Sequence, residues 1–357
     1  MNLSLYPTYP TFIPQLSNMS EPVEVLITIP FREALQSKLR AVSPRLKLRI
    51  IKAMTAKEVS DDIWQKVEVL YTDRVLPSPD QVPNLSWIQF HWAGIDHILD
   101  APIISKPDLV ITTLSGAAAS QMAEYIVMMI SALGHHLPEL FANQKRSEWP
   151  ADRWQRFIPK ELRNSKIGIV GYGSIGRQVA RLLQPFGAQI LAIKRDAMHP
   201  ADSGFSPEGL GDPDGDLVHR LYPPQALRSM VKECDFVIVT VPLTPETHHM
   251  IGAEELAAFK NDAYLIDVSR GGIVDHSALI PALVEQKLAG AALDVFPEEP
   301  LPAESPLWKL PNVILTPHIS GVTQYYDERA VELFAENLHR YLAGLPLYNR
   351  FNLERGY

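Results

Sequence analysis

Short apolar runs alternate with helical or turn-rich segments through the first third of the chain. Each run is only a few residues long and rich in Val, Ile and Leu, which is typical of strands buried in a parallel sheet. Because helix-like segments separate consecutive runs, the rhythm predicts a parallel α/β domain. Its strands are expected at residues 23–29, 46–51, 67–71, 87–90 and 109–113.

The same rhythm restarts at Lys166. A second and larger α/β domain is therefore expected, with a parallel sheet of its own. Residues 198–224 separate its second strand from its third; they are crowded with Gly, Pro and Asp and are predicted to form a long loop. The strands are expected at residues 167–170, 189–193, 236–240, 264–268, 290–294 and 313–316.

Three further segments complete the pattern. Residues 118–134 are apolar nearly all round, which predicts a helix buried between larger bodies and bridging the two domains. Residues 135–162 carry two tryptophans among charged side chains and are expected to form a surface arm. A last helix, residues 324–342, is expected to return to the first domain. Residues 1–20, rich in Pro, Ser and Thr, are expected to be a poorly ordered lead-in.

The composition fits a globular protein of two domains, since 357 residues are many for one core. A net charge of −8 without any Lys/Arg run argues against a nucleic-acid partner. The single cysteine excludes an intrachain disulfide, and no His, Asp or Glu spacing indicates a metal site. Since neither a signal peptide nor a membrane span is apparent, we expect a cytoplasmic protein without a membrane partner.

A glycine-rich turn follows the first strand of the second domain. Gly171, Gly173 and Gly176 have the Gly-x-Gly-x-x-Gly spacing and open a helical pattern. The first glycine permits the tight turn, the second lets the backbone approach a pyrophosphate, and the third lets helix and strand pack closely. In this context the motif predicts a dinucleotide-binding site with the helix N-terminus facing the phosphates; a merely structural turn is the alternative.

Two cations stand where the second strand of this domain ends. Lys194 and Arg195 occupy the place where a carboxylate usually binds the adenosine ribose. A carboxylate would repel a ribose 2′-phosphate, whereas these cations can bind it through charge-assisted hydrogen bonds. The sequence therefore favours NADP over NAD. In the alternative, both cations face solvent and Asp196 binds the ribose.

Three polar residues near the end of the chain, Arg270, Glu299 and His318, each follow a predicted strand. Because the carboxyl ends of neighbouring parallel strands form one edge of a sheet, we expect the three side chains to meet there. A cation, a carboxylate and an imidazole gathered at one edge can bind an anionic substrate and transfer a proton. They form the candidate active site, although a single histidine or Arg-Gly-Gly turn is more often structural.

Together these motifs resemble those of the D-isomer-specific 2-hydroxyacid dehydrogenases, which include glyoxylate/hydroxypyruvate reductases and phosphoglycerate dehydrogenase. The resemblance runs from about Leu85 to the C-terminus and rests on residues 93–97, 122–124, 171–176, 241–247, 269–275, 293–296 and 316–319.

The resemblance implies a Rossmann NAD(P)-binding domain, residues 117–321, inserted into a smaller flavodoxin-like parallel α/β catalytic domain, residues 1–116 and 322–357. It also implies a cleft that closes on the substrate, usually within a homodimer. Trp149 or Trp154 would cross the dimer interface, or else pack inside the chain.

The same resemblance implies NAD(P)-dependent reduction of a small 2-keto acid such as glyoxylate or hydroxypyruvate. His318 would donate the proton, and Glu299 would contact the imidazole and favour its protonated form. Arg270 would hold the substrate carboxylate and carbonyl oxygen, and backbone N–H groups around Ala93 and Gly94 would complete the pocket. The residues expected at the cofactor are Gly171, Gly173, Ser174, Ile175, Gly176, Lys194, Arg195, Val241, Pro242, Val268, Ser269, Asp294 and Gly321. For Asp294, a role as a support for the acid pair is the alternative.

Two other functions share these motifs. Formate dehydrogenases resemble the chain but carry glutamine where Glu299 stands, so the carboxylate argues against that reaction. Dinucleotide-sensing transcriptional corepressors share the fold and the three polar residues, so the fold alone does not separate catalysis from sensing. The absence of an obvious added interaction module favours the enzyme.

Overall fold

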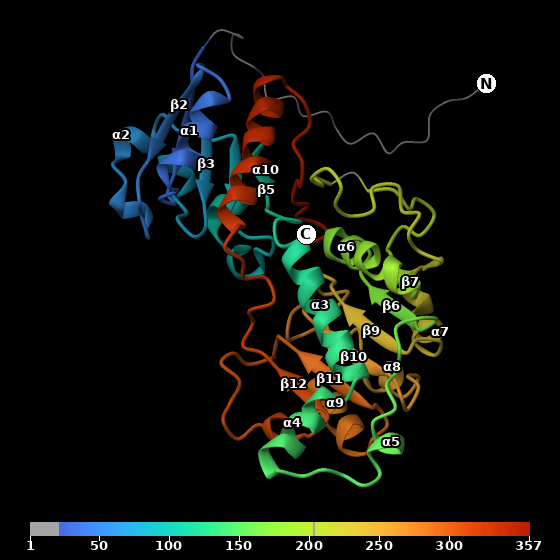
Figure 1. Cartoon of the computed structure of the whole chain (residues 1–357). Coiled ribbons are helices and arrows are strands. Elements are labelled where there is room, and N and C mark those ends of the chain that lie inside the picture. The colour runs from blue at the N-terminus through green and yellow to red at the C-terminus, as the bar shows by residue number, and fades with distance from the viewer. Residues whose placement is uncertain (1–20, 203) are drawn as a thin grey trace, which may run out of the picture. The chain divides into compact units, whose positions relative to one another are not determined.

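The computed structural model of the chain describes residues 21–202 and 204–357 (Figure 1). These residues divide into two compact units. The first unit holds the described residues up to Ala117 together with Gln324–Glu354, and the second holds Ala118–Thr323 with Arg355–Tyr357. The predicted lead-in, residues 1–20, lies outside the described residues.

The first unit is built on a parallel sheet with the strand order β2-β1-β3-β4-β5. This is the order of flavodoxin-like folds. All five predicted strands are present, although their ends differ from the expected ones. Their bounds are β1 Val23–Ile27, β2 Leu46–Ile50, β3 Val69–Thr72, β4 Trp87–Phe90 and β5 Val110–Thr112.

Three α-helices of the first unit are α1 (Glu33–Ala41), α2 (Asp61–Trp64) and α10 (Tyr326–Leu342). Helix α10 packs beside α1 and buries Val331, Phe334 and Leu338 in the same apolar cluster as β1 and β3. These positions recur at the spacing of one helix face, which explains why the end of the chain returns to the first unit.

The second unit contains a seven-stranded parallel sheet with the order β12-β11-β10-β9-β6-β7-β8. Chain order reverses between β6 and β9, which is the switch point at which Rossmann folds bind dinucleotides. The predicted fold class is confirmed. The bounds are β6 Lys166–Val170, β7 Gln189–Ile193, β8 Arg220–Tyr222, β9 Phe236–Val239, β10 Tyr264–Asp267, β11 Gly290–Leu293 and β12 Val313–Leu315.

Alternate strand residues point to opposite sides of this sheet, so its apolar strands present two apolar faces. Helices cover both faces. Ile169 and Ile238 join one buried cluster, whereas Val170 and Val239 join the other. Helix α3 (Ala119–Gly134) packs on α6 (Ser174–Leu183) and on β10 and β11 (Figure 1). The remaining α-helices are α4 Leu137–Arg146, α5 Arg153–Arg156, α7 Leu227–Val231, α8 Ala253–Leu256 and α9 His276–Val284.

Two expectations about elements need correction. The predicted loop 198–224 ends in strand β8, which pairs with β7 at the edge of the sheet. Strand β8 was not predicted because it contains the exposed, charged Arg220 and so lacks a continuous apolar run. Helix α3 is not buried all round, since Met128 is 55% exposed. No helix among the described residues is long and apolar enough to cross a membrane.

Candidate active site

The carboxyl ends of the second sheet gather the main candidate residues. The glycine loop follows β6, Arg270 follows β10, Glu299 lies beyond β11, and His318 follows β12. All these strands are parallel, so their carboxyl ends share one edge.

His318 and Glu299 form a direct pair. The imidazole Nδ1 lies 2.8 Å from Glu299 Oε2, and the other carboxylate oxygen, Oε1, accepts the Phe296 N–H at 2.9 Å. The carboxylate is thus held from two sides. When Nδ1 donates this hydrogen bond to Glu299 and keeps its proton, Nε2 is the ring atom that can gain and release a proton. The His318 side chain is 45% exposed, so solvent can exchange that proton.

The turn that carries His318 is fixed by Asp294. The Asp294 backbone carbonyl accepts the His318 N–H at 2.9 Å, and its two carboxylate oxygens accept the N–H groups of Ile319 and Ser320, each at 2.9 Å. These bonds offset the cost of His318 φ of 53°, a left-handed value that is uncommon outside glycine. Asp294 is fully buried, and these contacts hold the backbone turn that carries His318.

Side-chain hydrogen bonds also connect Asp294 to helix α3. The Thr316 hydroxyl donates to Asp294 Oδ1 at 2.6 Å and lies 2.6 Å from the Tyr125 hydroxyl. Burial raises the pKa of Tyr125 to about 12, so its hydroxyl keeps its proton and can donate to Thr316. Sequence reasoning missed Tyr125 because it lies within an otherwise apolar helix.

The turn that carries Arg270 contacts the segment that carries Glu299. A Cβ on Gly271 would lie 1.9 Å from the Phe296 carbonyl oxygen, so only glycine allows these backbones to meet. Phe296 is also the residue whose N–H binds Glu299. Arg270 itself donates from Nη1 to the Ser269 carbonyl at 2.9 Å. The structure therefore brings the elements of all three predicted residues together within one unit.

The glycine loop has the form that a dinucleotide pyrophosphate requires. Gly171 has φ of +107°, and a Cβ there would lie 2.9 Å from Val241 Cγ1. A Cβ on Gly176 would lie 2.5 Å from the Gly171 carbonyl oxygen, whereas one on Gly173 would have nothing within 4 Å among the described residues. Gly173 thus leaves open space at the N-terminus of α6, where unpartnered helix N–H groups favour an anion.

The other predicted cofactor residues of the second unit lie at or near this edge. Ser174 and Ile175 form the first turn of α6, and Gly321 follows the His318 turn. Val241 and Pro242 follow β9, while Val268 and Ser269 follow β10. Ala93 and Gly94 belong to the first unit, after β4, and their part in the site stays a prediction.

Both cations after β7 have partners in the structure. The Lys194 ammonium donates to the His199 and Ala201 backbone carbonyls. Arg195 Nη2 donates to Glu246 Oε2 at 2.6 Å, and its guanidinium lies 5.0 Å from the centre of the Tyr357 ring. Burial, together with the charge of Arg177, lowers the pKa of Lys194.

Asp267 is a buried acid that sequence reasoning passed over. Its Oδ1 accepts the Ser269 N–H at 3.0 Å and the Ser269 hydroxyl, while Oδ2 has no hydrogen-bond partner among the described residues. Burial raises the pKa of Asp267 to about 7; the Ser269 bonds oppose the shift and the Asp294 charge adds to it. A lone carboxylate inside an apolar strand was the available signal.

Asp267→Asn is expected to flatten the pH dependence of stability. The folded protein holds the Asp267 proton up to a pH of about 7, whereas the unfolded chain releases it near 3.8, so stability falls as pH rises between these values. Asparagine has no such proton. The variant's Tm, compared with wild type, is therefore expected to rise by several degrees between pH of about 5 and about 8. A constant Tm difference across this range would show that Asp267 does not titrate there.

No group of three or more His, Cys, Asp or Glu side chains in the described part of the chain is arranged to hold a metal ion.

Comparison with known proteins places this site in a family. The model for the NAD binding domain of D-isomer specific 2-hydroxyacid dehydrogenases matches residues 127–320. Glyoxylate reductase of Thermofilum pendens is 35% identical over 277 residues, which are 77% of each protein. D-3-phosphoglycerate dehydrogenase of Methanocaldococcus jannaschii is 30% identical over 335 residues, 93% of this chain and 60% of that protein. The chain belongs to the D-isomer specific 2-hydroxyacid dehydrogenase family.

Solved structures agree with this assignment. A D-isomer specific 2-hydroxyacid dehydrogenase from Xanthobacter autotrophicus Py2, crystallised with NADPH and MES, is 28% identical with a TM-score of 0.75. The match covers 95% of this chain and all of that one.

Proposed function

We propose that the chain is an NAD(P)-dependent reductase that converts small 2-keto acids, with glyoxylate and hydroxypyruvate as first candidates, into D-2-hydroxy acids. The observation that carries this proposal is the His318–Glu299 pair, 2.8 Å apart on the sheet edge that also holds the glycine loop. A proton donor and a dinucleotide site on one edge are what the reduction of a carbonyl group requires.

In this proposal His318 donates a proton from Nε2 to the carbonyl oxygen of the substrate. Glu299 keeps Nδ1 protonated and stabilises the imidazolium before the transfer. After the transfer the imidazole regains its proton from water, since the side chain is partly exposed. The reverse reaction, oxidation of the hydroxy acid, uses the neutral imidazole as the base.

Arg270 binds the anionic substrate and the charge that develops on its oxygen. A guanidinium offers several N–H donors in one plane, which suits a carboxylate and an adjacent carbonyl at the same time. The contact of Gly271 with Phe296 fixes the turn that presents this side chain.

A nicotinamide dinucleotide, when bound, supplies the hydride. The residues of this chain that would hold it are the glycine loop, the first turn of α6 and the residues after β9 and β10. The open space beside Gly173 and the packing of Gly171 and Gly176 fit this group.

Turnover with both reduced cofactors tests the proposal. We expect the full chain to oxidise NADPH, and less efficiently NADH, in the presence of glyoxylate or hydroxypyruvate, with the absorbance of the nicotinamide as readout. Parallel binding titrations separate this function from a dinucleotide sensor. A protein that binds NADPH but turns over no 2-keto acid of a broad panel would contradict the reductase and favour the sensor.

We propose that Arg195, more than Lys194, selects NADPH. The Lys194 ammonium is taken up by two backbone carbonyls, whereas Arg195 holds the exposed carboxylate of Glu246, which a 2′-phosphate could replace. Arg195→Ala is therefore expected to lower kcat/KM for NADPH by about 10–100-fold and to leave NADH nearly unchanged. Equal losses with both cofactors would refute this selectivity.

We also propose that the protein is a homodimer. Trp149 is 83% and Trp154 is 74% exposed, so neither packs inside the chain. Arg153 lies over both rings, 5.9 and 4.9 Å from their centres. Such exposed aromatic side chains suit an interface with a second copy, and sedimentation equilibrium would show the mass of two chains; the mass of one chain would contradict the dimer.

A further inference from the structure

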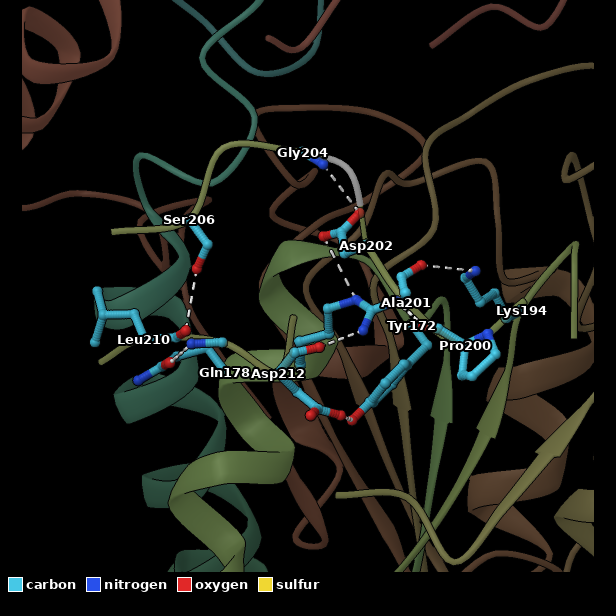
Figure 2. A network of polar contacts seen from close by, with 12 residues as sticks. Tyr172, Gln178, Lys194, Pro200, Ala201, Asp202, Gly204, Ser206, Leu210 and Asp212 are labelled. Carbon is cyan, nitrogen blue, oxygen red and sulfur yellow. Dashed lines mark hydrogen bonds and ion pairs between the residues drawn. The ribbon is translucent and has the colours of Figure 1, made fainter. Parts of the chain in front are cut away.

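The described residues between β7 and β8 contact one another from the two ends of their segment. We call its described residues, 198–202 and 204–217, the strap. The Asp202 N–H donates to the Pro213 carbonyl at 2.8 Å. The Ser206 hydroxyl donates to the Leu210 carbonyl at 3.0 Å (Figure 2). A Cβ on Gly215 would lie 2.6 Å from the Pro200 carbonyl oxygen, so the two ends of the strap are in direct contact.

The strap is tied to the glycine loop through Tyr172. This residue lies between Gly171 and Gly173, is 3% exposed, and donates its hydroxyl to Asp212 Oδ2 at 2.5 Å (Figure 2). Burial raises the pKa of Tyr172 well above its ordinary value, so the hydroxyl remains a donor. One residue of the loop that faces the cofactor therefore reaches directly into the strap.

Helix α6 is tied to the same strap by its first two turns. Arg177 is 1% exposed, donates to the backbone carbonyls of Asp212 and Pro200, and lies over the Tyr172 ring at 4.8 Å from its centre. Gln178 Oε1 accepts the N–H of Gly211 at 2.6 Å. These contacts hold the helix N-terminus that faces a bound pyrophosphate.

Asp212 accepts hydrogen bonds from both Tyr172 and Arg177. Besides Tyr172 and Arg177, it binds the N–H groups of Asp216 and Leu217 with its carboxylate at 3.1 and 3.2 Å. It is 4% exposed, and a buried polar group whose hydrogen bonds are made in this way rigidifies the elements it joins. A change at this point would move the strap and the glycine loop together.

We propose that the strap is a positioning element for cofactor binding, in which Asp212 fixes Tyr172 and Arg177 and thereby holds the glycine loop ready for the pyrophosphate. The inference rests on the proposed dinucleotide cofactor. None of the three residues needs to touch the cofactor. Because the pyrophosphate is common to both cofactors, the strap sets affinity for NADH and NADPH alike, unlike Arg195.

Tyr172→Phe tests the strap by removing one hydroxyl. We expect the Kd for both NADPH and NADH, from titrations of nicotinamide fluorescence, to rise about fivefold to tenfold, with kcat at saturating cofactor unchanged. Tyr222→Phe is the matched control. Its hydroxyl also donates to a carboxylate, Glu233 at 3.1 Å, but Glu233 binds Lys166 at the opposite end of β6 from the glycine loop.

The strap inference fails if Tyr172→Phe binds NADPH as tightly as Tyr222→Phe does. If Tm falls in both variants but NADPH binding weakens only in Tyr172→Phe, the weaker binding comes from the lost positioning of the glycine loop and not from a general loss of stability. Should Tyr172→Phe not fold, Gln178→Leu, which removes the acceptor of the Gly211 N–H, is expected to weaken NADPH binding; unchanged binding would overturn the inference. Wild type that binds neither dinucleotide would refute the proposed function instead.

Discussion

His318→Asn is expected to lower kcat for the reduction of glyoxylate by about 10²–10⁴-fold, the usual contribution of a general acid. Asparagine removes the acid but tolerates positive φ, so it suits the left-handed backbone at this position, where φ is 53°. The hydrogen bond from the His318 N–H to Asp294 involves only the backbone and is kept. The Kd for NADPH should stay within about twofold of wild type, since the proposed role of the imidazole is proton transfer and not dinucleotide binding.

His135→Ala is the matched control for this loss. His135 is exposed at the C-terminal end of α3 in the same unit and has no place in the proposed mechanism. Its kcat should match wild type. If His318→Asn also kept wild-type kcat while folding normally, the assignment of His318 as the proton donor would be wrong.

Arg270→Lys is expected to lower kcat/KM for the keto acid by about 10²–10³-fold, although the positive charge is kept. Lysine offers a point charge in place of a planar set of donors, so it cannot bind the carboxylate and the carbonyl oxygen together. The loss should appear in both KM for the keto acid and kcat, because the carbonyl oxygen gains charge only in the transition state.

A surface arginine separates this effect from a general change of charge. Arg228→Lys alters an exposed residue of α7 that pairs with Glu254, and it should retain wild-type kinetics. An Arg270→Lys enzyme with unchanged KM and kcat for glyoxylate would show that Arg270 does not bind the substrate. Binding of NADPH serves as the folding control for both variants.

Strands were predictable from sequence wherever both faces of the sheet are covered. Buried parallel strands read as continuous apolar runs, as at Ile167–Val170 and Phe236–Val239, and these agree with β6 and β9. Strand β8 was not predicted because it lies at the edge of the sheet, where side chains such as Arg220 remain exposed and no continuous apolar run is required. The glycine spacing also marked the first strand of the second domain, since a pyrophosphate-binding turn directly follows the first Rossmann strand.

Candidate site residues could be predicted where a polar residue directly follows a strand. Contacts between residues that lie far apart in the sequence could not be predicted. Arg270 and His318 could be picked out because each comes after an apolar run. Tyr172 and Asp212 are forty positions apart, and no periodicity connects them. The contact of Gly271 with Phe296 likewise depends on how two turns pack, which only tertiary structure reveals.

We propose that this family member reduces a small 2-keto acid to its D-2-hydroxy acid with hydride from a nicotinamide cofactor. The most direct measurement is the amount and configuration of glycerate formed from hydroxypyruvate and NADPH by the full chain, set against the NADPH consumed. We expect one molecule of D-glycerate for each NADPH oxidised. Formation of L-glycerate, or NADPH binding without any glycerate, would contradict it.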